Sequence, residues 1–235
     1  MEERNIKPYN KSIIIVEKCI SHINKIETFE KHWISVFSDL LNRILWNCRN
    51  LNDYCNNRQY HLTIRLLQRS IIEDLIVVFF FLSLADEKED FDAALDVLNV
   101  QSKKSLEKWL EIHYEIDKAN SGQGENYITK EEYLKEYNDY CDNTITHNDK
   151  TCAKLIKGTF TGNISQMEEL TKGTEVGKAI HYLYAEYRFL SQVEHYCFFN
   201  RGYSYCHKKD NTIDTHRKVI EFCIRYLYET ISCFK

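Results

Sequence analysis

The segment Arg58–Leu84 reads RQYHLTIRLLQRSIIEDLIVVFFFLSL, and it decides the fold. From Leu75 onward the segment is apolar on every side of a helix, so other helices have to cover its whole circumference. The apolar run is far shorter than the roughly 20 residues that a helix needs to span a bilayer. We therefore expect a core helix at the centre of a bundle, and no contact with a membrane.

Helical patterns continue on both sides of this core segment. Apolar residues recur at intervals of three or four positions, which is the repeat of an amphipathic helix. The expected helices cover residues 11–26, a long stretch that follows an N-cap at Thr28, residues 175–199 and residues 212–233. Residues 88–116 are expected to form either one helix or two helices that break near Gln101 and Ser102. A capping box of Thr129 and Glu132 predicts a further short helix that ends near Asp142.

The chain of 235 residues contains only 7 Gly and 1 Pro, too few for the many turns of a sheet protein. The sequence therefore predicts an all-α protein, a single-domain bundle of about six to eight helices over residues 1–235. Helices 58–84 and 175–199 are expected to pack at its centre. Residues 143–173 form an irregular excursion, which is read as a lid, a partner-binding segment or a simple connection.

Charge and cysteine content indicate which partners and which redox environment suit the protein. The net charge of −4 gives no general attraction to nucleic acid, although a local basic patch remains compatible with it. The nine cysteines are scattered, and no apolar signal segment opens the chain. We expect a cytoplasmic protein with reduced thiols, of which those in helical patterns are buried: Cys19, Cys48, Cys197, Cys223 and Cys233.

A polar ladder runs into the core helix. His61, Arg65, Arg69 and Glu73 follow one another at intervals of four and therefore share one helical face. Charged groups that enter a buried helix need partners, because an unpaired buried charge is costly. The ladder is either a structural ion-pair network, for example of Arg69 with Glu73, or a functional site in the bundle core.

A second polar face occurs on the helix over residues 175–199. Tyr184, Arg188, Ser191 and His195 recur at intervals of four, three and four, with Tyr187 beside them. A histidine near an arginine can act as a general base beside a phosphate clamp, and Glu73 can orient the imidazole if the two helices pack together. The alternative is a histidine and a serine that are hydrogen-bonded inside a helix interface.

Two stretches of sequence resemble a known group of proteins. The sequence RSIIE at residues 69–73 and the sequence YRFLSQVEH at residues 187–195 are similar to the two signature helices of certain bacterial all-helical proteins, the second of which reads Tyr-x-x-Leu-Ser-x-x-x-His. Such families occur near mobile-element and abortive-infection genes. The resemblance covers about a fifth of the chain and implies a defence or toxin protein with a cognate partner or antitoxin.

Arg188 and His195 also resemble the arginine–histidine motif of the HEPN superfamily, many of whose members are metal-independent ribonucleases that act as paired protomers. The resemblance implies a homodimer that cleaves RNA, with His195 assisting attack by the 2′-hydroxyl group and Arg188 steadying the phosphate. A second match joins Arg201 to His207, so the sequence leaves the choice of catalytic histidine open.

The segment around Arg201 and His207 has two further interpretations. Lysines and Tyr203 and Tyr205 surround these residues, which is typical of an RNA-binding surface and also of a solvated loop. His195, Cys197, Cys206 and His207 are all of zinc-binding type, but their spacing does not suit one tetrahedral ion, and we expect neither a metal nor another cofactor.

Two functional hypotheses follow from these observations. The first is a HEPN-like ribonuclease whose catalytic residues are His195, Arg188, Glu73, Arg69 and Ser191. Residues with a binding role are then Tyr184, Tyr187, Arg65, Arg201 and His207. The second hypothesis is a non-catalytic module that binds a partner protein or a small anionic ligand in the bundle core.

Overall fold

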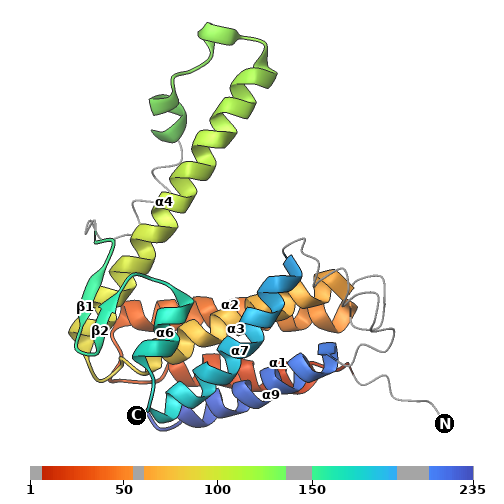
Figure 1. Cartoon of the computed structure of the whole chain (residues 1–235), viewed down its shortest axis with the longest axis vertical. Coiled ribbons are helices and arrows are strands. Elements are labelled where there is room, and N and C mark those ends of the chain that lie inside the picture. The colour runs from red at the N-terminus through yellow and green to blue at the C-terminus, as the bar shows by residue number, and fades with distance from the viewer. Residues whose placement is uncertain (1–6, 55–60, 136–149, 195–211, 235) are drawn as a thin grey trace, which may run out of the picture. The chain divides into compact units, whose positions relative to one another are not determined.

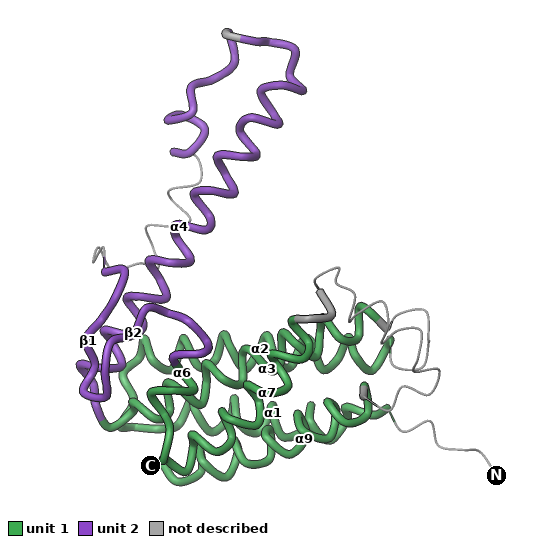
Figure 2. Tube along the Cα trace, in the orientation of Figure 1, with its two compact units in different colours: residues 1–86, 167–235 green, residues 87–166 purple. Residues whose placement is uncertain are grey.

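The computed structural model describes residues 7–54, 61–135, 150–194 and 212–234, and these residues form two compact units (Figures 1 and 2). Unit 1 comprises residues 1–86 and 167–235, and unit 2 comprises residues 87–166. The predicted fold class is confirmed, because the described parts of the chain are a helical bundle with one very small sheet. That the chain is a single domain stays a prediction.

The described residues of unit 1 form five long helices. These are α1 (Asn10–Ile23), α2 (Lys31–Tyr54), α3 (His61–Leu82), α7 (Glu175–Glu194) and α9 (Thr212–Ile231). The most extensive helix contact joins α3 to α7, and α3 also packs against α2 and α9 (Figure 1). Phe79, Phe80 and Phe81 of α3 are fully buried, as expected for a helix that is apolar on all sides. The prediction that these two helices pack together is thus confirmed.

Unit 2 is built around one helix, α4 (Lys88–Ser121), with the 3-10 helix η2 (Gly124–Asn126) after it. The strands β1 (Ala153–Leu155) and β2 (Gly158–Phe160) pair antiparallel, with Ala153 opposite Phe160 and Leu155 opposite Gly158. The hairpin is attached to α4 by the buried Asp90, whose Oδ2 accepts a hydrogen bond from the backbone N–H of Ile156 at 2.8 Å. The short helix α6 (Ile164–Leu170) then crosses the boundary between the units.

Of the two alternatives for residues 88–116, one helix or two helices with a break near Gln101 and Ser102, the structure shows one helix. The helix is continuous through both residues, and the side-chain amide of Gln101 donates a hydrogen bond to the backbone carbonyl of Thr161. This polar side chain therefore serves a tertiary contact and does not end the helix. The α4 helix ends instead at Gly122, whose φ of 67° gives the left-handed C-cap that glycine adopts readily.

Two other predictions about helix starts have opposite outcomes. The N-cap at Thr28 is wrong, because α2 begins at Lys31 and Thr28 lies in the turn before it. The capping box is confirmed: Thr129 N donates to Glu132 Oε2 at 3.0 Å, and Glu132 N donates to Thr129 Oγ1 at 3.2 Å.

The excursion over residues 143–173 is regular from the hairpin onward, because β1, β2 and α6 fall within it. Its first part, residues 143–149, lies outside the described residues.

Candidate functional site

The contact between α3 and α7 contains a polar cluster formed by Arg69, Tyr187 and Ser191. Arg69 Nη2 donates a hydrogen bond to Tyr187 Oη at 3.2 Å, and Arg69 Nε donates to Ser191 Oγ at 3.3 Å. The guanidinium carbon lies 5.1 Å from the centroid of the Tyr187 ring, within the range of a cation–π contact. The structure therefore brings together three of the residues that the sequence singled out on two separate helices.

The geometry of α7 explains how its two hydroxyl groups reach one guanidinium. Tyr187 and Ser191 are four residues apart and therefore share a helical face. Ser191 Oγ donates to the carbonyl oxygen of Tyr187 at 2.8 Å, so its lone pairs remain directed at Arg69. Tyr184 stacks on Tyr187 with ring centroids 6.4 Å apart and an interplanar angle of 17°. The cluster thus has an aromatic wall on one side.

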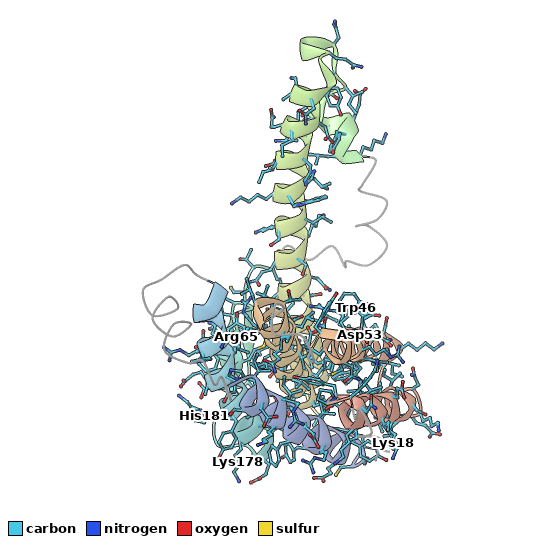
Figure 3. The ribbon with its side chains drawn as sticks, turned by 90° about the vertical axis from the view of Figure 1, so that its right-hand side faces the viewer. Lys18, Trp46, Asp53, Arg65, Lys178 and His181 are labelled. Carbon is cyan, nitrogen blue, oxygen red and sulfur yellow. The ribbon has the colours of Figure 1, made fainter. Side chains whose placement is uncertain are left out.

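The other predicted site residues lie in different surroundings. Arg65, labelled in Figure 3, is buried, Glu73 is half-buried, and Arg188 is exposed. The side chain of His61 lies outside the described part of the chain. The same is true of His195, Arg201 and His207, so the arginine–histidine motifs themselves are not placed. The α7 helix is described as far as Glu194, the residue directly before His195 in the sequence.

A second polar cluster, which the sequence analysis missed, ties three helices of unit 1 together. Gln68 is fully buried, and its Nε2 donates to Tyr9 Oη at 2.8 Å and to the carbonyl oxygen of Ile213 at 2.9 Å. Tyr9 is also fully buried, and its backbone N–H donates to Asn52 Oδ1 at 2.8 Å. The only sequence signal was a glutamine among the apolar residues before Arg69.

Sequence reasoning also missed a buried histidine–carboxylate pair between α7 and α9. His216 is buried on α9, and its Nδ1 contacts Glu186 Oε2 of α7, while its ring lies 5.3 Å from that of Phe189. His216 Nε2 is buried and has no hydrogen-bond partner within the described ranges. Burial, together with the smaller effect of the Glu186 carboxylate, raises the pKa of the nearby Cys223 thiol to about 12. No local pattern marked His216, because its partner lies 30 residues earlier.

Asp74 is the most strongly perturbed carboxyl group of α3 in the described part of the chain. Burial raises its pKa to about 7; the Arg43 guanidinium of α2 acts in the opposite direction and Glu73 acts in the same direction. Oδ1 lies 3.1 Å from Arg43 Nη2, whereas the buried Oδ2 has no hydrogen-bond partner among the described residues. Asp74 therefore faces α2 and does not belong to the Arg69 cluster.

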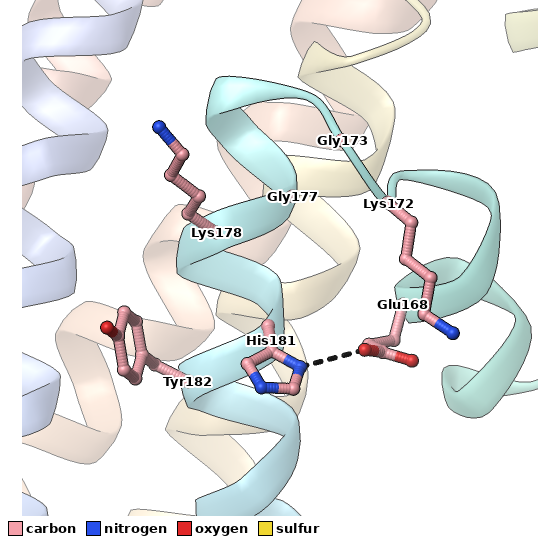
Figure 4. Close-up of a pocket in the computed structure, with 7 residues that line it drawn as sticks. All are labelled: Glu168, Lys172, Gly173, Gly177, Lys178, His181 and Tyr182. Carbon is pink, nitrogen blue, oxygen red and sulfur yellow. Dashed lines mark hydrogen bonds and ion pairs between the residues drawn. The ribbon is translucent and has the colours of Figure 1, made fainter.

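A surface pocket of about 250 Å³ lies where α6 leads into α7 (Figure 4). His181 Nδ1 lies 2.9 Å from Glu168 Oε1 at its edge, and Lys172 and Lys178 also line it. Lys178 pairs with Glu175 at 2.6 Å and Lys172 pairs with Glu169, so both cations have acidic neighbours on their own segments. The His181 side chain is mostly exposed, so its imidazole is open to solvent. The sequence analysis did not select any of these residues.

The described residues give two further results on possible sites. In these ranges, no group of three or more histidine, cysteine, aspartate and glutamate side chains is placed to hold a metal ion. None of the described helices combines the length and the apolarity that crossing a membrane requires. The predicted zinc-type residues His195, Cys197, Cys206 and His207 lie outside these ranges.

Comparisons with protein-family models, with curated proteins and with solved structures find no match for this chain. The interpretation of the polar clusters therefore rests on their geometry and chemistry.

Proposed function

We propose that the protein is a bacterial defence or toxin protein that cleaves RNA without a metal ion, as HEPN-like ribonucleases do. The observation that supports this proposal is the Arg69 cluster, in which two hydroxyl groups of α7 accept hydrogen bonds from the half-buried guanidinium of Arg69. His195 follows Ser191 by four residues in the sequence, directly after the described part of α7. In this proposal the protein works in the cytoplasm and meets RNA as its substrate.

The chemistry of the cluster suits a phosphodiester. A guanidinium presents several N–H donors in one plane and forms strong, charge-assisted hydrogen bonds with phosphate oxygens. The two hydroxyl groups accept hydrogen bonds from Nε and Nη2, so they fix the orientation of the guanidinium plane. We propose that Arg69, with Arg188 from the exposed side of α7, stabilises the negative charge that develops on the phosphate during attack.

His195 is the proposed general base. It would take the proton of the RNA 2′-hydroxyl, whose oxygen attacks the adjacent phosphorus atom while the bond to the 5′-oxygen of the next nucleotide breaks. The proton then passes to that leaving oxygen, and the products are a 2′,3′-cyclic phosphate and a free 5′-hydroxyl. No metal ion and no other cofactor take part in this reaction, so cleavage in the presence of EDTA is expected.

The test is cleavage of total RNA and transfer RNA in EDTA by wild type, His195→Ala, His207→Ala and Arg69→Ala. Loss of cleavage in His195→Ala and Arg69→Ala, with activity kept in His207→Ala, supports the proposal. The matched control is Arg49→Ala, because Arg49 is an exposed arginine that pairs with Glu17 at 2.8 Å on another part of unit 1. Loss in His207→Ala alone moves the site to the Arg201–His207 segment, and no cleavage by wild type overturns the proposal.

One observation favours the second function, a module that binds without cleaving. The Arg69 contacts run between two core helices, and the Gln68 and His216 contacts also join helices. In that case the polar clusters hold the bundle together, or they bind a small anionic ligand or a partner protein such as an antitoxin. Binding of inorganic phosphate, used as a small anionic probe, by a wild type that does not cleave RNA, and its loss in Arg69→Ala, would support this function.

A further inference from the structure

The C-terminal half of α4 in unit 2 presents a stripe of large apolar side chains to solvent. Trp109 is 52% exposed, Ile112 is 53% exposed and Ile116 is 47% exposed. These residues are three and four positions apart, so they line one helical face, and Ser105, four residues before Trp109, continues it. A contiguous apolar stripe of this kind marks an interaction site more often than scattered single residues do.

The opposite side of the same helix is already covered within unit 2. Leu110 and Tyr114 are buried, and Tyr114 lies against Tyr127 and Tyr133 with ring centroids 5.8 and 5.5 Å apart. The segment after α4 turns back along the helix (Figure 1), and its Tyr127 and Tyr133 contact the side that carries Tyr114. The stripe therefore faces away from the packed side, and it is not part of the core of unit 2.

We propose that a second copy of this chain binds the stripe, with the two α4 helices packed antiparallel. The intervals of the stripe are those of the a and d positions of a heptad, the pattern of helices that pack side by side. Lys108 and Glu115 lie together on one flank of it, and both are exposed. Their charges are opposite, and a two-fold axis between the helices brings Lys108 of each copy opposite Glu115 of the other.

The charges favour the antiparallel over the parallel arrangement. In parallel helices a flanking residue faces the residue five positions later on the partner. Lys108 would then face His113, and Glu115 would face Asn120, with no opposite charges matched. In the antiparallel arrangement residues of the same flank face each other, so two symmetric Lys108–Glu115 pairs form. Rim charges of this kind contribute chiefly to the choice of partner and orientation.

Side-chain size fits the register that these charge pairs set. In that register Trp109 of one copy lies against Ile112 of the other, and Ile116 lies opposite the small Ser105. Alternation of large and small residues across an interface lets helices approach closely. The dimer interface thus has two Trp109–Ile112 layers, which the two-fold axis relates to each other. One Lys108–Glu115 pair lies beside each layer. The proposal rests on unit 2 alone and does not depend on the proposed function.

The test measures the mass of the full-length protein by sedimentation velocity over a concentration series. Wild type is expected to approach twice the monomer mass, and Ile112→Glu is expected to remain a monomer. The matched control is Ile156→Glu, because Ile156 is another isoleucine of unit 2 that is 75% exposed but lies at the hairpin. This control should associate as wild type does, and circular dichroism should show unchanged helix content in each variant.

Charge reversal tests the orientation. Lys108→Glu and Glu115→Lys should each weaken the dimer, and the double variant Lys108→Glu/Glu115→Lys should restore it, because opposite charges again face each other. A monomeric wild type at every concentration overturns the proposal and assigns the stripe to another partner or to a contact within the chain. A dimer that survives Ile112→Glu, or a double variant as weak as the single variants, also overturns it.

Discussion

Asp74 is buried in α3, whereas its ion-pair partner Arg43 on α2 has most of its side chain in solvent, with 3.1 Å between Oδ1 and Nη2. The carboxyl group therefore loses its hydration but gains a partner whose charge is screened by water. Burial prevails, and the pKa of Asp74 rises to about 7. At a pH between these values, Asp74 of the folded protein keeps a proton that the unfolded chain, with an ordinary pKa of 3.8, has released.

This proton links the stability of the fold to pH. Between the unfolded pKa of 3.8 and the folded pKa of about 7 the native state binds more protons than the unfolded state. The free energy of unfolding therefore falls as pH rises through this window, and it levels off above it. Counted for this group alone, the loss is on the order of 4 kcal/mol.

Urea unfolding of wild type and Asp74→Asn at about pH 5 and about pH 8 measures this contribution. The asparagine variant cannot ionise, so it should lose less stability over this range than wild type does. Asp53→Asn is the control, because Asp53 is exposed and pairs with Lys7 at the surface. Equal pH dependence in wild type and Asp74→Asn would contradict the prediction.

The Arg69 cluster predicts a measurable coupling between α3 and α7. Tyr187→Phe keeps the ring beside the guanidinium but removes the hydroxyl group, and we expect it to lower the free energy of unfolding by about 1 kcal/mol. Arg69→Lys should cost more, because an ammonium group cannot reproduce the planar fork that reaches both Tyr187 and Ser191.

A double-mutant cycle of these two substitutions isolates the contact, and a coupling of about 0.5 kcal/mol or more is expected for residues that touch. Tyr182→Phe serves as the control, because Tyr182 lies on the same helix and is 63% exposed. Additive effects of Arg69→Lys and Tyr187→Phe would show that their contact contributes nothing to stability.

At Gly177 we expect a Gly→Ala substitution to change the free energy of unfolding in the direction opposite to that in an ordinary helix. In an ordinary helix a Gly→Ala substitution is stabilising. Here a methyl group on Gly177 would overlap the backbone carbonyl oxygen of Thr171, and Gly177 N donates to the N-capping hydroxyl of Thr174 at 2.9 Å. We expect Gly177→Ala to destabilise the protein by about 1–3 kcal/mol, the usual cost of overpacking.

Thermal unfolding followed by circular dichroism measures this change. The control is Ala185→Gly, an exposed position of the same helix where the reverse substitution should cost about 1 kcal/mol for propensity alone. An increase in stability on Gly177→Ala would show that the turn before α7 relaxes at little cost.

Thiol reactivity provides a prediction about the core. Burial raises the pKa of the Cys19, Cys48 and Cys223 thiols to about 12, which leaves almost no thiolate at neutral pH. Cys152 and Cys233 are exposed. Among these five cysteines of the described ranges, mass spectrometry after iodoacetamide treatment of the native protein should find Cys152 and Cys233 modified and the three buried thiols unmodified. In urea all five of them should react. Modification of Cys48 in the native state at the rate of Cys152 would contradict the structure.

The cysteines also show what the sequence could predict. Cys19, Cys48 and Cys223 are buried as predicted because the apolar stripe of each helix contains them, whereas burial of Cys233 was wrong because α9 ends at Ile231. Cys197 lies outside the described residues. Periodicity thus locates the buried face of a helix well and its end less well, since the end depends on capping contacts that a hydrophobic pattern does not record.

The candidate site was predictable only in part. Intervals of four placed Tyr187 and Ser191 on one face. Because α3 is apolar from Leu75 onward, it had to pack against other helices, so the meeting of Tyr187 and Ser191 with Arg69 follows from local patterns. The pair of His216 with Glu186 and the contacts of Gln68 do not, because each depends on which helices become neighbours. The same limit explains Gln101, which looked like a break in a helix and instead contacts Thr161.

The order of synthesis gives one structural feature a further consequence. The core helix α3 is covered in part by α7 and α9, which follow it in the chain only after the whole of unit 2 has been made. Until α7 and α9 have left the ribosome, they cannot pack against the Phe79–Phe81 run. A nascent chain of this protein should therefore be a substrate for the chaperones that bind apolar segments at the ribosomal exit, and release from them should coincide with the emergence of α9.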